Sequence, residues 1–231
     1  PGKSGVHFKG NESTVYDVNL WVRSGIRVLE LLSQITLDPD EEAGDTLYEA
    51  FRGVVEWPEW LHSEDMSFSV DSRIWGNSNF TNSQLLNVRA KDAICDYIRE
   101  KNGFKPSPPL RGRVADVPIF ATAFSDVLSI YLDHSGRSLH KRAFASKKMH
   151  KASLNECAAA ACLQLAGFPE LLKNSGGETV TLVDPMCGGG TILSEAAMIA
   201  GNIAPGLYRT FWPFLRWPTC RKSLWQERVD R

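Results

Sequence analysis

The spacing of hydrophobic and polar residues predicts helices and strands in a mixed order. Residues 12–32 carry apolar side chains near the helical repeat and predict one amphipathic helix. Residues 66–74 alternate apolar and polar side chains, as a half-buried strand does. Residues 83–102 return to the helical repeat, and Gly103 stands where a C-terminal cap belongs.

Two further patterns complete the first half of the chain. Residues 117–133, VPIFATAFSDVLSIYLD, form two β-rich runs on either side of Ser125-Asp126 and predict a hairpin. Residues 45–55 predict a short helix. Helices interspersed with a strand and a hairpin indicate an α+β module.

The second half follows a different order. Ser153 and Glu156 fit a capping box, which predicts an alanine-rich helix that begins there and ends near Gly167. Residues 179–184, TVTLVD, predict a buried strand, and a helix beginning at Thr191 follows three glycines. A strand, a glycine turn and a helix in succession are typical of a nucleotide-like ligand site in an α/β sheet.

The amino-acid composition mainly excludes classes of protein and kinds of site. The 231 residues are 43% hydrophobic, enough for one large domain or two small ones, and the net charge of −1 creates no overall field that selects nucleic acid or membrane. The five cysteines form no CxxC pair and the histidines show no metal-ligand spacing, so we expect no disulfide framework, no metal and a reducing compartment. No apolar run reaches the length of a membrane span, and we expect no membrane partner.

The glycine turn, LVDPMCGGGTIL, admits few ligand classes. A phosphate-binding P-loop is excluded because Gly190, and not lysine, precedes Thr191. A dinucleotide fingerprint fits poorly because Leu193 occupies its third glycine position. S-adenosylmethionine remains, with its methionine end against Gly188 and its ammonium group at Asp184. The pattern alone leaves this ligand and a turn that merely packs helix on strand equally open.

The sequence around this turn, and several other stretches of the chain, resemble one protein family. DPMCGGGTILSEAAMIAGNIAPGL is similar to the DPMCGSGTxLIEAAMxAxxxAPG block of the THUMP-domain RNA methyltransferases, and in particular of the large-subunit ribosomal RNA guanine-N2 methyltransferases. Other stretches agree with that family in order and spacing: GVHFKGNESTVYDVNLWVRSGIRVLELL, SRIWGNSNFTNSQLLNVRAKDAICDYIREK, LDHSGRSLHKRAFA and ASLNECAAAACLQLAGF.

The resemblance implies a fold and an activity. It implies an α+β THUMP-type RNA-binding module, residues 1–148 with a clipped start and a basic linker, followed by the first part of an α/β Rossmann-like S-adenosylmethionine-dependent methyltransferase domain, residues 149–231. The implied reaction is methylation of the exocyclic amine N2 of a guanine in large-subunit ribosomal RNA. The implied location is intracellular, in the cytoplasm or in an organelle with bacterial-type ribosomes.

The resemblance also implies roles for residues. The cofactor-binding residues would be Asp184, Pro185, Cys187, Gly188, Gly190 and Thr191, with Glu156 near the donor pocket and Glu195 as structural support. Residues 135–153 carry six cations and no carboxylate, so they serve either as an RNA contact or as a solvated linker, and beside a THUMP-like module we favour RNA. The RNA-binding residues would then be Arg137, His140, Lys141, Arg142, Lys147 and Lys148.

Two features depart from the family or stay open. Asn155 replaces a lysine of the family, and Ala143-Phe144-Ala145 replaces Gly-Tyr-Arg, which puts one RNA contact in doubt. Aromatic residues alternate with Arg216 in residues 211–217 and suit either base stacking or packing, of which we favour packing.

The family's catalytic loop, Asn-Pro-Pro-Tyr/Phe, does not occur in the sequence, so no catalytic residue is assigned. A single parallel strand at residues 179–184 would also need neighbouring strands that the sequence does not predict. We therefore expect a fragment, a truncated product or a portion of a larger enzyme. The alternative is a truncated, catalytically inactive RNA-binding protein.

Overall fold

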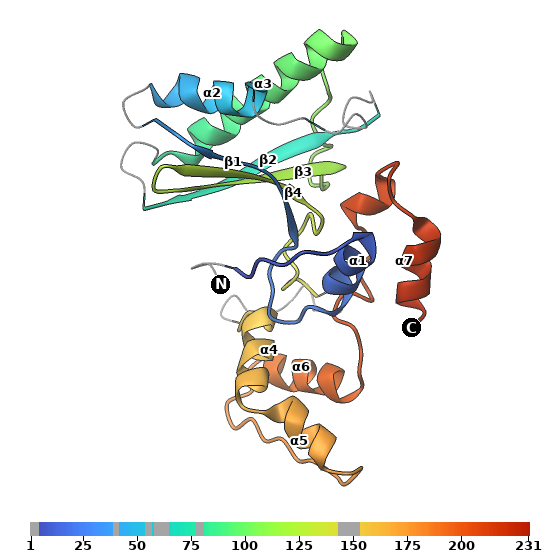
Figure 1. Cartoon of the computed structure of the whole chain (residues 1–231). Helices are drawn as coiled ribbons and strands as arrows, with labels where there is room; N and C mark the ends of the chain where they lie inside the picture. Colours follow the sequence, from blue (N-terminus) through green and yellow to red (C-terminus); the bar gives the residue numbers. More distant parts are fainter. Residues whose placement is uncertain (1–4, 39–41, 54–56, 58–64, 77–80, 143–152) are drawn as a thin grey trace. The chain divides into compact units, whose positions relative to one another are not determined.

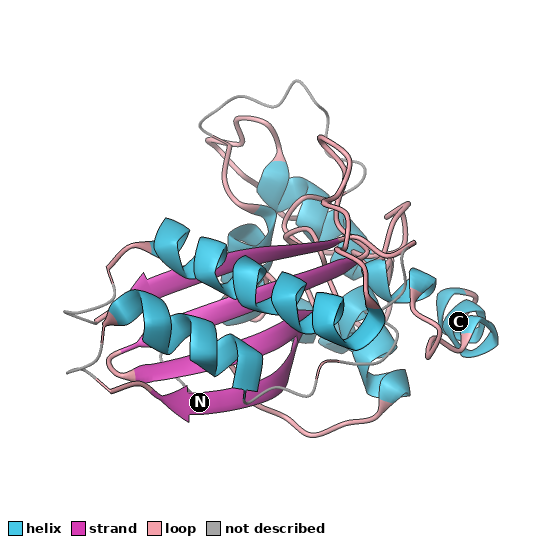
Figure 2. Cartoon of the chain, turned by 90° about the horizontal axis from the view of Figure 1, so that it is seen from above, coloured by secondary structure: helices cyan, strands magenta, loops and turns pink. Residues whose placement is uncertain are grey.

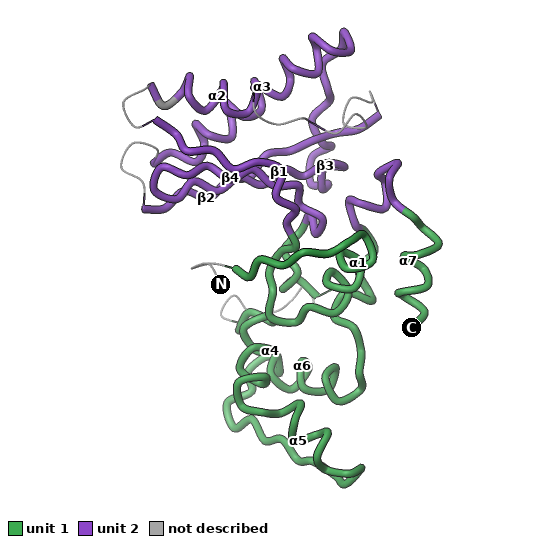
Figure 3. Tube along the Cα trace, viewed as in Figure 1, with its two compact units in different colours: residues 1–28, 137–211, 221–231 green, residues 29–136, 212–220 purple. Residues whose placement is uncertain are grey.

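The computed structural model describes residues 5–38, 42–53, 57, 65–76, 81–142 and 153–231. It divides into two compact units, drawn in purple and green in Figure 3. The sheet unit comprises residues 29–136 and 212–220, and the helical unit comprises residues 1–28, 137–211 and 221–231. The expected domain boundary near residue 148 lies outside the described residues.

The sheet unit is built on four strands covered on one face by two helices (Figures 1 and 2). The strand order is β1-β4-β3-β2, antiparallel except for the parallel pair of β2 and β3. Helix α3 joins that parallel pair, because parallel neighbours need a crossover connection. The elements are β1 (Leu29–Thr36), α2 (Ala43–Gly53), β2 (Phe68–Trp75), α3 (Ser83–Asn102), β3 (Val117–Phe124) and β4 (Val127–Asp133).

Helix α3 is confirmed together with its C-terminal cap, and the structure adds an N-terminal cap at Asn82. The Asn82 side chain accepts hydrogen bonds from the backbone N–H groups of Gln84 (2.9 Å) and Leu85 (3.2 Å). At the other end Gly103 takes the left-handed conformation, with φ of 78°, and closes the helix. Of the apolar face that the sequence predicts, Leu86, Ala90, Ile94 and Ile98 are buried, and Tyr97 is half-buried.

The hairpin of β3 and β4 is confirmed as well. Phe124 pairs with Val127, so Ser125 and Asp126 form the turn, and Ser125 adopts a positive φ of 51°. Alternate side chains of the two strands are buried and form the centre of the unit: Ile119, Ala121, Ala123, Leu128, Ile130 and Leu132.

The predicted helix over residues 12–32 is wrong in its second half. Helix α1 (Glu12–Trp21) ends where Val22 takes extended backbone, and a capping box of Asn11 and Thr14 opens it. Residues 29–36 form β1 instead, which pairs with β4 from Leu29 to Thr36. Strand pairing with a distant segment decided the structure, because leucine and valine at helical spacing also suit a strand.

The helical unit collects α1 with four later helices. These are α4 (Glu156–Leu165), α5 (Phe168–Asn174), α6 (Thr191–Ala200) and α7 (Lys222–Val229). Helices α4, α5 and α6 share a small core of Leu163, Phe168 and Ala196. Val180 and Ile192 pack against it, which anchors the glycine-rich turn on both sides.

Two predictions about this unit are wrong. Helix α4 is capped by Asn155, whose side chain accepts from the N–H groups of Cys157 (2.9 Å) and Ala158 (3.3 Å), and not by Ser153 with Glu156. Asparagine is among the best N-cap residues, and here it lies one residue before the helix.

Residues 179–184 form no strand in the described structure. Leu182 and Val183 are 37% and 75% exposed, so the segment is not buried either. A strand exists only through hydrogen bonds to a neighbouring strand, and residues 153–231, all of them described, contain no strand to pair with.

The aromatic residues near 211–217 pack, as we favoured. A turn of 3₁₀ helix, η2 (Pro213–Arg216), lies between the buried Trp212 and Trp217 in the sheet unit. The Trp217 indole donates to the backbone carbonyl of Asp116 at 2.7 Å, and Arg216 pairs with the Asp116 carboxylate at 2.5 Å. Buried tryptophans, one of them with its N–H bonded to the backbone, are structural rather than free for base stacking.

Candidate functional site

The glycine turn lies directly before α6 in the helical unit. Gly188 and Gly190 both have positive φ, of 52° and 73°, a conformation that glycine adopts without strain. The backbone N–H of Gly190 donates to the carbonyl of Cys187 at 2.7 Å and closes the turn. A Cβ atom at Gly190 would meet nothing within 4 Å, and one at Gly188 only the Met186 carbonyl oxygen at 4.0 Å. The space beside the turn is therefore open to a ligand.

The first turn of α6 offers polar groups to that space. Its N-cap is Gly190, which has no side chain to satisfy the N–H groups of the first turn. These N–H groups form the positive end of the helix dipole and attract negatively charged or polar atoms. Asp184, at the start of the turn, accepts from the Met186 N–H at 3.1 Å, which fixes its carboxylate at the loop.

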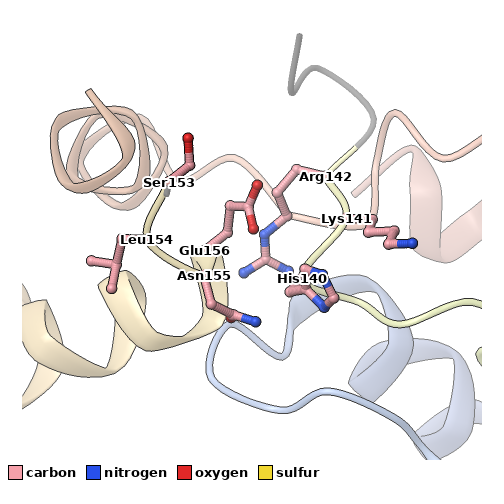
Figure 4. Close-up of a pocket in the computed structure, with 7 residues that line it drawn as sticks. All are labelled: His140, Lys141, Arg142, Ser153, Leu154, Asn155 and Glu156. Carbon is pink, nitrogen blue, oxygen red and sulfur yellow. The ribbon is translucent and has the colours of Figure 1, made fainter. Parts of the chain in front are cut away.

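A cavity of about 430 Å³ lies in the same unit, between residues 140–142 and residues 153–156. Figure 4 shows the Glu156 carboxylate directed toward the Arg142 guanidinium, with the His140 ring nearby. Glu156 is only 8% exposed and lines the cavity. Burial lowers the pKa of His140 below its ordinary value, and the nearby Glu156 carboxylate opposes that shift.

The cavity and the glycine turn meet at Ser153. The Ser153 hydroxyl lines the cavity and lies 3.7 Å from the Cβ position of Gly189. Its oxygen is buried and has no hydrogen-bond partner in the described structure. The capping-box pattern assigned Ser153 to a helix cap and so missed this position.

Arg142 requires a correction, because it is not available to RNA. Its side chain is 2% exposed and forms an ion pair with Glu195, which is 1% exposed, at 3.0 Å from Nε to Oε1. Further donors reach the backbone carbonyls of Leu139 (2.8 Å) and Arg23 (2.7 Å). A guanidinium with its donors committed inside the protein cannot also neutralise a phosphate. The expected structural role of Glu195 agrees with this geometry.

The other proposed RNA contacts divide into three groups. Arg137 and Lys141 are exposed, and His140 is half-buried with its Nδ1 at 2.5 Å from the Ser138 hydroxyl. Lys147 and Lys148 lie outside the described residues.

The proposed donor residues lie on two segments of the helical unit, residues 184–191 and Glu156 at the start of α4. The loop residues Pro185, Cys187 and Gly188 are exposed, and Thr191 is buried as the first residue of α6. Glu156 is linked to this loop through the Ser153 side of the cavity. Within the described residues no group of three His, Cys, Asp or Glu side chains could hold a metal ion, and no helix is long and apolar enough to cross a membrane.

Comparison with known proteins adds three family matches. Residues 44–133 match the THUMP domain, residues 145–230 match the methyltransferase domain described as RMKL-like, and residues 1–29 match the RlmL ferredoxin-like domain. The chain thus combines a THUMP domain with RMKL-like methyltransferase sequence. The THUMP match covers most of the sheet unit, and the methyltransferase match includes the glycine turn and α6.

Individual relatives agree with these matches. The ribosomal RNA large subunit methyltransferase K/L of Syntrophotalea carbinolica is 35% identical over 229 residues, which are 99% of this chain and 30% of that protein. A structure described as a predicted N6-adenine-specific DNA methylase from Listeria monocytogenes matches with a TM-score of 0.75 and 26% identity, over 96% of this chain and 53% of that chain. SMU.472, a candidate methyltransferase complexed with SAH, matches with a TM-score of 0.72 and 25% identity, over 96% and 54%.

The chain matches only part of the length of each of these proteins. The chain spans about a third of the curated relative and about half of the structural relatives. What is shared includes the THUMP domain and the glycine turn with α6.

Proposed function

We propose that this chain provides the RNA-binding and methyl-donor-binding parts of an enzyme that methylates the exocyclic amine N2 of a guanine in large-subunit ribosomal RNA. The observation that carries the proposal is the open glycine turn at the N-terminus of α6, on the same chain as a THUMP domain. The methyl donor would be S-adenosylmethionine, and the activity would lie where ribosomes are assembled.

The residues present fit the methionine end of that donor. The turn has no Cβ atom at Gly188 or Gly190 and open space at both positions, so a ligand backbone can approach closely. The α6 N–H groups suit the donor's carboxylate, and the fixed Asp184 carboxylate suits its ammonium group. The buried Glu156 carboxylate supplies a second acceptor beside the loop.

Each part of the chain then has a distinct task. When bound, S-adenosylmethionine supplies the methyl group that the target amine receives. The helical unit holds the donor against the turn, and its buried core keeps α6 in place. The THUMP domain, with exposed linker cations such as Lys141, binds RNA, and the target base must leave its stack to reach the donor.

The sequence given holds no Asn-Pro-Pro-Tyr/Phe loop, and no group of this chain is assigned to the target amine. The chain by itself is therefore expected to bind the donor weakly and to transfer no methyl group. Each charge-assisted hydrogen bond that a complete pocket adds contributes about 1.5–3 kcal/mol, so two of them change affinity by orders of magnitude.

A chimera tests the function. Residues 1–230 are fused to the portion of the Syntrophotalea carbinolica relative that follows the matched region, and labelled S-adenosylmethionine is incubated with ribosomal RNA lacking the modification. Digestion to nucleosides identifies the methylated atom. We expect label at guanine N2, and its loss in Asp184→Ala and Gly188→Val, which remove the polar contact and the open space respectively.

Other outcomes contradict the proposal in different ways. Label at adenine N6, the specificity in the name of the Listeria relative, would leave the donor site intact and replace the substrate. No label, with RNA binding unchanged, would favour the non-enzymatic alternative of an RNA-binding protein. Tight SAH binding by the 231-residue chain in calorimetry would show that the pocket is complete without further chain.

A further inference from the structure

The buried ion pair of Arg142 and Glu195 joins three segments of the helical unit that are far apart in sequence. Glu195 lies on α6, Arg142 follows the turn that contains Leu139, and the Arg23 carbonyl belongs to the segment after α1. The guanidinium contacts all three at once, through Nε, Nη1 and Nη2. The planar fork of arginine gives such contacts a defined direction.

The segment after α1 is itself tied to both helices of the donor region. The Cys157 thiol, at the start of α4, donates to the Gly25 carbonyl at 3.1 Å. The Arg23 guanidinium donates to the Ile203 carbonyl at 2.8 Å, just beyond the end of α6. Helix α6 is therefore held at its middle by Arg142, through Glu195, and after its end by Arg23.

Stability alone does not account for a buried ion pair at this place. Desolvation of two charges offsets most of their attraction, and well-packed apolar side chains of similar size often serve equally well. What the pair adds over apolar packing is orientation, because two forked hydrogen bonds fix the angle at which Glu195 and its helix lie. Glu195 is four residues after Thr191, so any rotation of α6 displaces the glycine turn directly.

The turn depends on α6 for its position. Its own hydrogen bonds include the short closure from Gly190 to Cys187 and the contact of Met186 with Asp184, and most of its residues are exposed. We propose that Arg142 and Glu195 are positioning residues, which orient α6 so that the glycine turn faces the methyl donor. The inference rests on the proposed function, in that the turn is taken to bind the donor.

The test uses the full chain and does not depend on turnover. In the amide NMR spectrum, the resonances of Gly188, Gly189 and Gly190 report the geometry of the turn without ligand, and a titration with SAH reports its affinity. The double variant Arg142→Met with Glu195→Met removes both charges at similar bulk. We expect a folded protein whose melting temperature is lower than wild type, because the carbonyls of Leu139 and Arg23 lose their donor. We also expect shifted glycine resonances and SAH affinity weakened about tenfold or more, because small misplacements of binding groups are costly.

Two further variants separate orientation from charge. Arg142→Lys keeps the charge but loses the fork, and it should shift the same resonances. The control is Arg221→Met with Glu12→Met, which removes an ion pair of the same unit whose side chains are 64% and 27% exposed. It should leave the glycine resonances unchanged.

The inference is overturned if the double variant is folded and its glycine resonances match wild type, or if it fails to fold, since the pair then acts only in stability. An SAH titration without response in the wild-type chain is a separate failure. It would count against the donor site of the proposed function, while the ligand-free resonances would still decide the role of the pair.

Discussion

The close contact of Gly206 with the end of α1 gives a sharp prediction. The Gly206 N–H donates to the Leu20 carbonyl at 2.9 Å, and the residue is buried. A Cβ atom added there would lie 2.8 Å from the Asn19 carbonyl oxygen, 3.0 Å from the Leu20 Cα and 3.1 Å from the Leu20 carbonyl oxygen. All three atoms are backbone, so no side chain can rotate away, and Gly206→Ala must push the two segments apart.

The magnitude follows from two effects. Overpacking a tight contact costs about 1–3 kcal/mol. Weakening the hydrogen bond to Leu20 adds about 0.5–1.5 kcal/mol. We therefore expect Gly206→Ala to lower the free energy of unfolding by roughly 2–4 kcal/mol. For a chain of this size that corresponds to a melting temperature lower by about 5–12 °C.

Urea unfolding followed by tryptophan fluorescence measures the free energy, and hydrogen exchange of the peptide containing α1 locates the change. Gly53→Ala is the control, because Gly53 is the last residue of α2, has an ordinary φ and would place its Cβ in open space. That variant should be neutral or slightly stabilising. Equal stability of Gly206→Ala and wild type, with unchanged exchange in α1, would refute the contact as described.

Three further outcomes are expected. Lys141→Ala should weaken binding to structured RNA and reduce the salt slope of a filter-binding titration by about one, since Lys141 is an exposed cation in the segment that follows the THUMP domain in the sequence. The hydrogen bond from His134 holds the pKa of Glu30 below its ordinary value of 4.5, so this pair stabilises the fold above that pH and the stabilisation is lost as pH falls through the lowered pKa. Glu30→Gln should accordingly flatten the acid limb of a stability profile. Iodoacetamide should modify the exposed Cys187 far faster than Cys157, whose pKa is raised by burial, as peptide mass spectrometry would show.

The helices and strands that were predicted correctly are specified by residues close to them in the sequence. Helix α3 has its N-cap, apolar face and C-terminal glycine within one stretch, and the β3–β4 hairpin has its turn between its own strands. Helix α6 follows its glycine turn directly. Local patterns decide such elements because the partners that satisfy the backbone are close in sequence.

The wrong predictions concern segments whose partners are distant. Strand β1 exists because β4, almost a hundred residues later, pairs with it, and residues 179–184 are not a strand because no described neighbour does. The sequence marks Gly206 only as the last residue of the APG block shared with the family. The reason for a glycine there, a close approach to α1, requires the folded backbone.

Arg142 shows how the same limit affects the candidate site. In the sequence it is one cation in a run without carboxylates, and a count of charges assigns it to RNA. Its carboxylate is Glu195, fifty-three residues away, and both side chains are almost fully buried. Among the described cations of this run, Arg137 and Lys141 remain exposed. The Arg142 guanidinium is buried and therefore does not contribute to an RNA-binding surface. Through its ion pair with Glu195 it instead orients α6, the helix that positions the glycine turn.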